Sequence, residues 1–364
     1  MKRGIWILPD GMGQELEAIW EEPPASLKYL AEVGETFRLA PIGASFEAEV
    51  VGLGLDYEIA SGPLVVAGFD WQPPNRSVHF EMNLLSVNEE GIVESVDQVT
   101  DEEARILSAE FAQLETKKLF PRWGEQTTHG LVWEDGSIDL GCATATEAHG
   151  HHWEARLPEG DGELILRTFI DDSLNLLDGL ELNQRRFDEG KPKANLLWPY
   201  SFGFRPELPN LPLRRGEIAT ILSDDVRLEG IARLVGYRHR ERTIFRQGVH
   251  VSGKALRGMC VSDGMEILVD RGLGGMLVNN RGEEARYAVE KFDEGAWERI
   301  AIGLRDGEPV SGAILCPRFA EVGLGLIFGS GVTGNSVPFD SRAWDDRRLR
   351  NLRFSEVMAN LLGG

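Results

Sequence analysis

The chain lacks histidine throughout its last third, because His250 is the last of its seven histidines in 364 residues. Imidazole is the commonest metal ligand and the usual general acid or base near neutral pH. Any metal site or acid–base site in the last third must therefore be built from other side chains.

Cysteine and long apolar runs are also scarce. The three cysteines, Cys142, Cys260 and Cys316, are far apart and form no Cys-x-x-Cys pair, which argues against a disulfide framework and against structural zinc. The longest apolar runs, such as residues 5–8, are too short to cross a bilayer. The N-terminal residues lack the features of a signal peptide. We therefore expect a cytoplasmic protein with reduced thiols.

Positive charge is in short supply as well. The chain has 38 lysines and arginines against 59 aspartates and glutamates, and its formal net charge is −21. Sequence-independent binding of nucleic acid depends on lysine and arginine contacts with phosphates. Anionic membranes attract basic segments in the same way. We therefore expect no nucleic-acid partner and no membrane partner.

Short apolar segments that alternate with helical patterns indicate an α/β fold. Residues 5–8 are apolar without alternation, which is typical of a strand buried on both faces. Similar strands are expected at 266–269, 312–316 and 323–328. Apolar spacing predicts helices at 25–33, 218–235 and 354–362. A chain of this length can hold one large α/β domain and an inserted one.

The middle of the chain has patterns typical of both helices and strands. Thr100 and Glu103 have the spacing of a capping box, which predicts a helix start. We expect a strand at 80–87, strands and loops at 121–163, a short helix at 170–180 and a loop at 183–204.

Several segments occur in a recognisable order. The first strand ends at Pro9-Asp10-Gly11, which places a carboxylate where open α/β sheets bind ligands. The later segments are Gly62-Pro63-Leu64, Asn183-Gln184-Arg185-Arg186 with Gly190-Lys191 and Ala194-Asn195, Leu228-Glu229-Gly230, and Val337-Pro338-Phe339. In order and spacing they resemble the archaeal-type cofactor-independent phosphoglycerate mutases of the alkaline phosphatase superfamily.

This resemblance implies a fold and its division into domains. The fold is an alkaline-phosphatase-like α/β core, with a mostly parallel sheet flanked by helices, interrupted by an inserted α+β cap domain. The resemblance places the core in residues 1–61 and 213–364 and the cap in residues 62–212.

The resemblance also implies a chemistry. The family moves a phosphoryl group on glycerate through a phosphoserine, and two divalent ions about 3.5–4 Å apart hold the phosphate. Asp10 matches the first carboxylate ligand. Ser45 lies where the nucleophilic, metal-ligating serine belongs. The plainer interpretation of both is a turn residue beside glycine.

Most of the other ligands that the resemblance implies have no counterpart. The family has an aspartate–histidine pair near residues 275–290, another after the strand that matches residues 313–315, and a histidine just before Val337. Here these places hold Asn279-Asn280-Arg281, Cys316-Pro317-Arg318 and Asn335. Arg281 and Arg318 could bring cations to the place of the metals, although solvated loop arginines are the plainer interpretation. The loss of most ligands should abolish a two-ion site.

Residues of the expected cap are candidate substrate ligands. Arg186 and Asn195 could bind a carboxylate or phosphate, or could hold their loop through backbone hydrogen bonds. His151 lies in a cluster with His149 and His152, which could bind zinc or copper or could be incidental. Glu81 stands where the family has an arginine, and this charge reversal argues against phosphoglycerate as the ligand.

We therefore expect a divergent pseudoenzyme without a cofactor, which binds a small anionic metabolite or a protein partner; its oligomeric state is undefined. The alternative is an active phosphoglycerate mutase, an isomerase, or a phosphatase that uses Ser45 with Mn²⁺, Mg²⁺ or Zn²⁺. Its substitute carboxylate ligands would be Glu47, Glu49, Glu283 or Glu284. A third interpretation is an interaction protein with a large exposed apolar patch.

Overall fold

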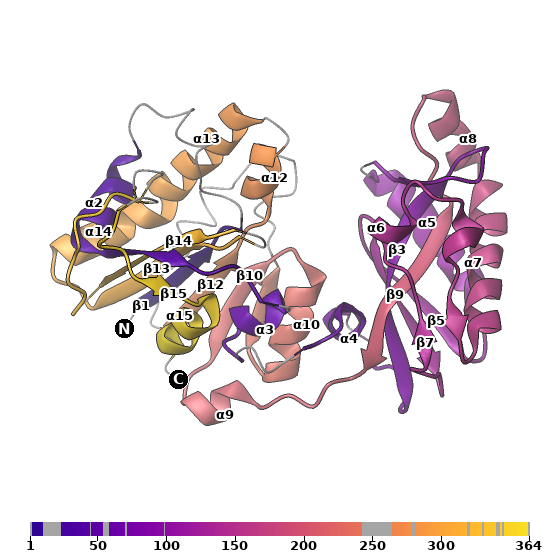
Figure 1. Ribbon diagram of the computed structural model, residues 1–364, viewed down its shortest axis with the longest axis horizontal. Helices are drawn as coiled ribbons and strands as arrows, with labels where there is room; N and C mark the ends of the chain where they lie inside the picture. Colours follow the sequence, from indigo (N-terminus) through magenta and orange to yellow (C-terminus); the bar gives the residue numbers. More distant parts are fainter. Residues whose placement is uncertain are drawn as a thin grey trace. The chain divides into compact units, whose positions relative to one another are not determined.

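The computed structural model divides the chain into two compact units. Unit 1 comprises Met1–Glu58 and Pro209–Gly364, and unit 2, Ile59–Leu208, is inserted between them in the sequence (Figure 1). The structure describes residues 2–9, 23–43, 45–53, 58–69, 71–97, 99–241, 264–278, 281–318, 321–329, 331–339, 343 and 346–362.

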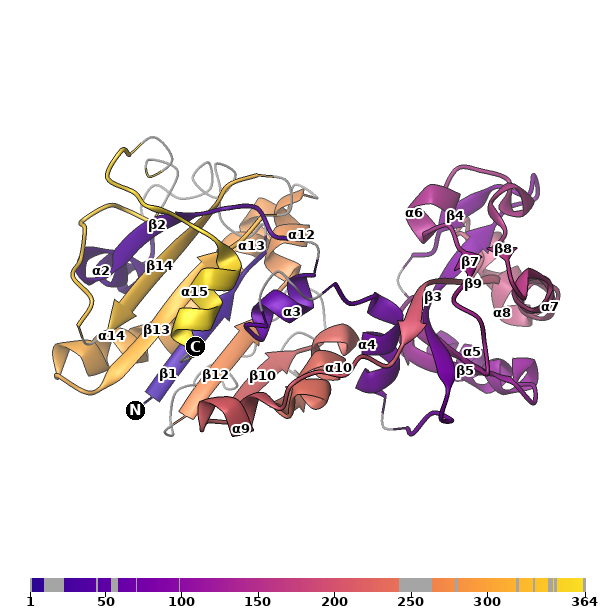
Figure 2. The same cartoon turned by 60° about the horizontal axis from the view of Figure 1, so that its bottom comes forward.

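Unit 1 is built on a mostly parallel sheet of eight described strands, in the order β11-β10-β12-β1-β13-β14-β2-β15 (Figure 2). Their bounds are β1 (Lys2–Ile7), β2 (Glu35–Leu39), β10 (Ala219–Ser223), β11 (Arg238–Glu241), β12 (Gly264–Val269), β13 (Val310–Cys316), β14 (Gly323–Gly329) and β15 (Asn351–Leu352). The five strands from β11 to β13 run parallel, whereas β14 is antiparallel to both of its neighbours. The parallel strands therefore end at one common edge.

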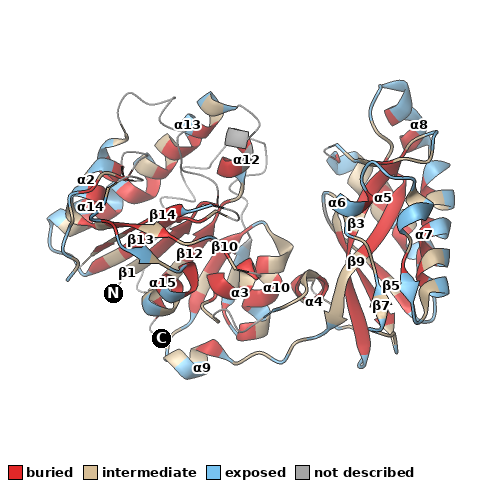
Figure 3. Ribbon diagram, in the orientation of Figure 1, coloured by how far each residue is buried: buried red, intermediate tan, exposed pale blue. Residues whose placement is uncertain are grey.

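Helices cover both faces of this sheet. Trp6 of β1 packs in a core cluster with Phe292 and Trp297, whereas Ile5 and Ile7 point to the opposite face, and all three β1 side chains are fully buried. In Figure 3 the strands of this sheet are drawn mostly in the colour of buried residues, whereas the helices beside them also carry exposed residues. This double coverage explains the unbroken apolar run in the sequence. The helices are α2 (Ala25–Val33), α3 (Phe46–Val50), α9 (Leu211–Arg215), α10 (Val226–Val235), α12 (Gly272–Val278), α13 (Gly282–Phe292), the π-helix η3 (Asp293–Trp297), α14 (Glu298–Arg305) and α15 (Phe354–Leu361).

Unit 2 is built on an antiparallel sheet around β3 (Ser77–Val87), which pairs with β4 (Val93–Ser95), β6 (Thr128–Glu134) and β9 (Leu196–Phe204). β5 (Leu119–Glu125) pairs with β6. Phe80 and Met82 on one face of β3 share a core cluster with Phe111 and Ile170. The larger helices are α4 (Ser61–Gly68), α5 (Asp101–Phe111), α7 (Glu163–Asp178) and α8 (Glu181–Asp188). The smaller elements are η1 (Ala112–Leu114), β7 (Leu140–Gly141), α6 (Ala145–Ala148), η2 (Trp153–Arg156) and β8 (Glu159–Gly160).

Helix α4 lies unusually close to β3 and β9. A Cβ atom on Gly62 would be 2.4 Å from the carbonyl oxygen of His79 and 2.5 Å from that of Ser201. Glycine is therefore the residue that allows this helix to approach the sheet, which gives the Gly62-Pro63 motif a packing role.

The expected fold class is confirmed, as are the strands near 5–8, 80–87, 266–269, 312–316 and 323–328. The expected loop at 183–204 is wrong, because most of it forms α8 and β9. Pro199 argues against a strand in the sequence, because proline has no backbone N–H to donate. β9 can contain this proline because β3 is the only strand described beside β9. The expected helix at 218–235 is wrong in its first part, which is β10, and Asp225 caps the helix that follows. Within the described residues, no helix is both long and apolar enough to span a membrane.

Candidate functional site

Polar and charged residues follow the parallel strands of unit 1 at the edge where these strands end. Asp225 lies just beyond β10, and Asp270 and Arg271 follow β12 directly. The carboxyl edge of a parallel sheet is where α/β proteins collect their ligands. This edge is therefore the candidate site of unit 1.

Arg271 joins two carboxylates from distant parts of the chain at this edge. Its Nη2 atom lies 3.0 Å from Oε1 of Glu47 and 3.4 Å from Oδ2 of Asp225. Its guanidinium also lies over the ring of Phe46, 4.7 Å from the ring centre. We call Glu47, Asp225 and Arg271, with Phe46, the Arg271 cluster. It carries two negative charges and one permanent positive charge.

Asp270 is a buried carboxylate that the sequence reasoning missed. It is 1 % exposed, and its Oδ1 atom accepts a 2.7 Å hydrogen bond from the Gly272 N–H. Its own N–H donates to the Ile7 carbonyl, which holds it beside the end of β1. The signal was available, because Asp270 follows an apolar strand just as Asp10 does.

Ser45 lies at the N-cap of α3, directly before the two α3 residues of the Arg271 cluster. A serine in this place usually accepts a hydrogen bond from the first helical turn. Here the hydroxyl makes no such bond; it is buried, without a hydrogen-bond partner among the described residues. Asp10, the other predicted metal ligand, lies outside the described residues.

The proposed substitute carboxylates are spread over different environments. Glu47 pairs with Arg271, whereas Glu49 is buried and accepts a 2.7 Å hydrogen bond from the Gly43 N–H. Burial raises the pKa of Glu49, although backbone hydrogen bonds from Gly43 and Ser355 oppose the shift. Glu284 of α13 pairs with Arg281, which lies at the N-cap of this helix, and the first turn of α13 also holds Glu283.

The places that the family gives to histidines have structural contacts here. Asn335 receives a 3.2 Å hydrogen bond from the Thr36 N–H and donates at 2.7 Å to the Thr36 carbonyl, so it ties its loop to β2. Cys316 is fully buried, and burial raises the pKa of its thiol. Arg318 pairs with Glu321.

Arg186 is buried inside unit 2. Its Nε donates to the Pro192 carbonyl and its Nη1 to Glu103, both at 2.8 Å, and its side chain is 2 % exposed. Burial alone would raise the pKa of Glu103, but hydrogen bonds from Thr100 and Arg186 lower it. Arg186 therefore fastens the loop after α8 to the start of α5.

Asn195 is buried nearby and pairs with the backbone of β3. Its Oδ1 accepts from the Val87 N–H at 2.7 Å, and its Nδ2 donates to the Val87 carbonyl at 3.1 Å and to Asp178 at 2.8 Å. Asn183 makes similar bonds to the backbone at Leu177 and Ala194. The motif that includes Arg186 and Asn195 thus connects α7, α8 and the start of β9 through hydrogen bonds.

The predicted histidine cluster lies at the surface of unit 2. His149, His151 and His152 are exposed, and the His151 carbonyl accepts a hydrogen bond from Val93. Within the described residues, no group of three or more histidines, cysteines or carboxylates has a metal-binding arrangement. Glu81 is buried and accepts a 2.7 Å hydrogen bond from the Tyr200 hydroxyl.

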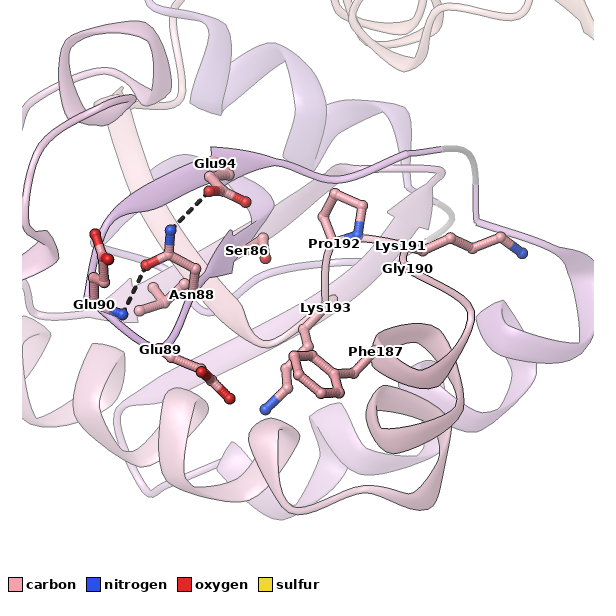
Figure 4. Close-up of a pocket in the computed structure, with 11 residues that line it drawn as sticks. Ser86, Asn88, Glu89, Glu90, Glu94, Phe187, Gly190, Lys191, Pro192 and Lys193 are labelled. Carbon is pink, nitrogen blue, oxygen red and sulfur yellow. Dashed lines mark hydrogen bonds between the residues drawn. The ribbon is translucent and has the colours of Figure 1, made fainter.

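The Gly190-Lys191 motif lines a cavity of about 440 Å³ in unit 2 (Figure 4). On one side of it Asn88 donates to Glu94 at 2.7 Å, and on the other side the Lys193 ammonium lies 5.8 Å from the centre of the Phe187 ring. Both charge signs line this cavity, and Lys193 is already paired with Asp178 at 2.8 Å. The cavity therefore has no clear charge preference.

Comparison with known proteins agrees with this fold. No family model matches the chain. It is 26 % identical to the 2,3-bisphosphoglycerate-independent phosphoglycerate mutase of Methanothrix thermoacetophila over 256 residues, which cover 64 % of this chain and 63 % of that protein. Identity to the mutase of Methanosarcina barkeri is 27 % over 245 residues, covering 65 % and 54 %. The matches thus span less than two thirds of these relatives.

Solved structures resemble the chain over almost its whole length. A cofactor-independent phosphoglycerate mutase from Thermoplasma acidophilum has a TM-score of 0.58 at 17 % identity and covers 100 % of both chains. A protein from Pyrococcus horikoshii has a TM-score of 0.64 at 16 % identity, covering 99 % and 97 %. The predicted resemblance is confirmed: the relatives of this chain are archaeal-type 2,3-bisphosphoglycerate-independent phosphoglycerate mutases at low identity, and it has their alkaline-phosphatase-like fold.

Proposed function

We propose that this phosphoglycerate-mutase-like protein does not perform two-metal phosphoryl transfer and instead binds a small anion at the carboxyl edge of the unit 1 sheet. The observation that carries the proposal is the position of Arg271. Its guanidinium lies between Glu47 and Asp225. In the sequence, Glu47 closely follows Ser45, and Arg271 directly follows Asp270.

A fixed cation changes what these carboxylates can bind. Mg²⁺ and Mn²⁺ need several oxygen ligands with free lone pairs. Arg271 neutralises part of the charge of Glu47 and Asp225 and cannot lose its proton. A divalent ion would have to displace it and leave a partly buried guanidinium without a partner. We infer that the described donor set does not fit a pair of divalent ions.

The same edge offers donors to an anion. The Nε–H group of Arg271 and the hydroxyl of Ser45 are both buried, and neither has a hydrogen-bond partner among the described residues. Unpaired buried donors are costly, and an incoming anion that accepts from them would remove this cost. Carboxylate and phosphate oxygens are the natural acceptors for arginine.

Metal titration of the full-length protein tests this proposal. We expect wild-type protein, soaked in excess Mn²⁺ and desalted, to retain fewer than two ions per chain by elemental mass spectrometry. In Arg271→Gln the carboxylates lose their cation, so Mn²⁺ affinity should rise about tenfold, whereas Arg299→Gln, an exposed arginine of α14, should have no effect. Two tightly held ions in the wild type, both lost in Asp10→Ala, would overturn the proposal.

The second candidate is an active mutase or phosphatase that uses Ser45. It is favoured by the free Ser45 hydroxyl, which a helix-capping serine would not leave unpartnered. In this case Glu47 and Asp270 would supply oxygen ligands to Mn²⁺ or Mg²⁺. Mutase activity that depends on Mn²⁺ and disappears in Ser45→Ala would establish this candidate and exclude the first.

A further inference from the structure

A second polar cavity lies in unit 2 and shares no residue with the unit 1 site. It has a volume of about 310 Å³ and lies between the loop before β3, the start of β3 and the end of β9. Its polar lining comprises Gln72, Asn75, Arg76, Ser77, His79 and Arg205. We call it the His79 cavity. Its volume suits a small metabolite.

A chain of hydrogen bonds fixes the proton on His79. The Ser77 hydroxyl donates to the Pro74 carbonyl at 2.7 Å, so its hydrogen is already used. The Ser77 oxygen lies 3.0 Å from Nε2 of His79 and must accept the hydrogen bond in that contact. Nε2 therefore carries the proton, and Nδ1 of the neutral ring is a bare acceptor.

This bare acceptor has no partner among the described residues. His79 is 3 % exposed, and its Nδ1 atom is buried without a hydrogen bond. The ring is neutral near pH 7, because burial and then the charge of Arg205 lower the pKa of His79 to about 4. A buried acceptor without a donor is destabilising. A ligand that donates a hydrogen bond would remove this cost.

The rest of the cavity is cationic, although the chain as a whole has a net charge of −21. Arg205 is exposed and has no carboxylate partner among the described residues. The Nε atom of Arg76 lies 4.0 Å from Oδ1 of Asp135, which makes this ion pair a weak one. The backbone of Arg76 has a φ of 61°, a conformation that costs energy for a non-glycine residue. Two arginines are thus left available to an anion.

We propose that the His79 cavity binds a small anion that also carries a hydroxyl group. The anionic group pairs with Arg205 and Arg76, and the hydroxyl donates to Nδ1 of His79. This inference goes beyond the function proposed for unit 1 and does not depend on it, since every residue involved belongs to unit 2.

Three matched probes separate the two contacts: glycerol 3-phosphate has both groups, methyl phosphate has the anion without the hydroxyl, and glycerol has hydroxyls without the anion. The full-length protein, labelled with ¹⁵N-histidine, is titrated with each probe while the His79 Nδ1 resonance is followed. We expect saturable binding of glycerol 3-phosphate, about tenfold weaker binding of methyl phosphate and no saturation with glycerol.

Variants assign the contacts. Arg205→Gln changes an exposed side chain, so the fold is preserved, and it should weaken glycerol 3-phosphate at least about tenfold. Arg105→Gln on α5, equally exposed, is the matched control and should bind as the wild type does. The proposal fails if glycerol 3-phosphate leaves the His79 resonance unchanged or binds Arg205→Gln equally well. Equal affinity for methyl phosphate would overturn the hydroxyl contact.

Discussion

The two units differ in which of their buried groups have a pKa shifted by burial toward the neutral form. In unit 1, burial raises the pKa of the buried Glu49 carboxyl and of the half-buried Asp293 carboxyl. Unit 2 buries the imidazoles of His79 and His129, and burial lowers the pKa of His79 to about 4 and that of His129 to about 3. Burial thus favours the neutral form of each group. A carboxyl group is neutral at low pH, whereas an imidazole is neutral at high pH.

This contrast teaches that acid should act on the two units in opposite directions. A raised carboxyl pKa stabilises the folded state at low pH, and this stabilisation is lost as the pH rises through the folded pKa. A lowered imidazole pKa gives the reverse, because the unfolded state binds the proton first as the pH falls. In unit 1 the Asp346–Arg348 pair lowers the pKa of Asp346 to about 2, so this pair alone would make acid destabilise unit 1. Solvent screens the pair, so we expect its effect on stability to be small.

The largest expected effect is a loss of stability in unit 2 alone. In Gly62→Ala the new methyl group would clash with the backbone of His79 and Ser201, so α4 cannot stay on the sheet. We expect a loss of more than about 4 kcal/mol in the stability of unit 2. Hydrogen–deuterium exchange, read by mass spectrometry, should show fast exchange in 59–208 and unchanged protection in unit 1. Gly179→Ala, where a Cβ atom meets no contact closer than 3.9 Å, is the control and should be tolerated.

The second effect is the acid response itself. Between pH 6.5 and about 4, each buried histidine should destabilise unit 2 by up to about 1.4 kcal/mol per pH unit. Exchange rates measured from pH 7 down to 4, corrected for intrinsic chemistry, should therefore reveal opening of unit 2 before unit 1. If unit 1 opens first, or both open together, the contrast between buried carboxyls and buried imidazoles does not control stability.

A third effect concerns Asn195, which the sequence motif suggested as a substrate ligand. Asn195→Ala leaves the Val87 N–H and carbonyl without their buried partners, so unit 2 should lose about 2–4 kcal/mol in urea unfolding. Asn175→Ala, at an exposed site on α7, should change stability by less than about 0.5 kcal/mol. A stable Asn195→Ala variant with weaker ligand binding would support the ligand role instead.

The smallest effect tests a helix start. Thr100 caps α5, and Glu103 bonds back to the Thr100 N–H at 2.7 Å, which completes the predicted capping box. Thr100→Ala should cost unit 2 about 1 kcal/mol in the same unfolding assay. No measurable loss would show that the Arg186–Glu103 pair holds this helix end without the cap.

Local patterns made much of the fold predictable from the sequence. The run at 5–8, the Thr100–Glu103 spacing and the last helix each depend on neighbours within a few residues. β9 was not predictable, because Pro199 argues against a strand and only pairing with β3 outweighs it. The Arg271 cluster was hidden for a related reason, since Glu47, Asp225 and Arg271 meet only after three distant segments fold together.

We propose that the carboxyl edge of unit 1 does not transfer phosphoryl groups, and the modification state of Ser45 tests this proposal directly. The full-length protein would be incubated with Mn²⁺ and 3-phosphoglycerate, quenched in acid and digested, and the peptide that contains Ser45 would be examined by mass spectrometry. We predict that this peptide stays unmodified and that no 2-phosphoglycerate forms. A phosphoryl group on Ser45 that requires Mn²⁺ would contradict the claim and identify an active enzyme.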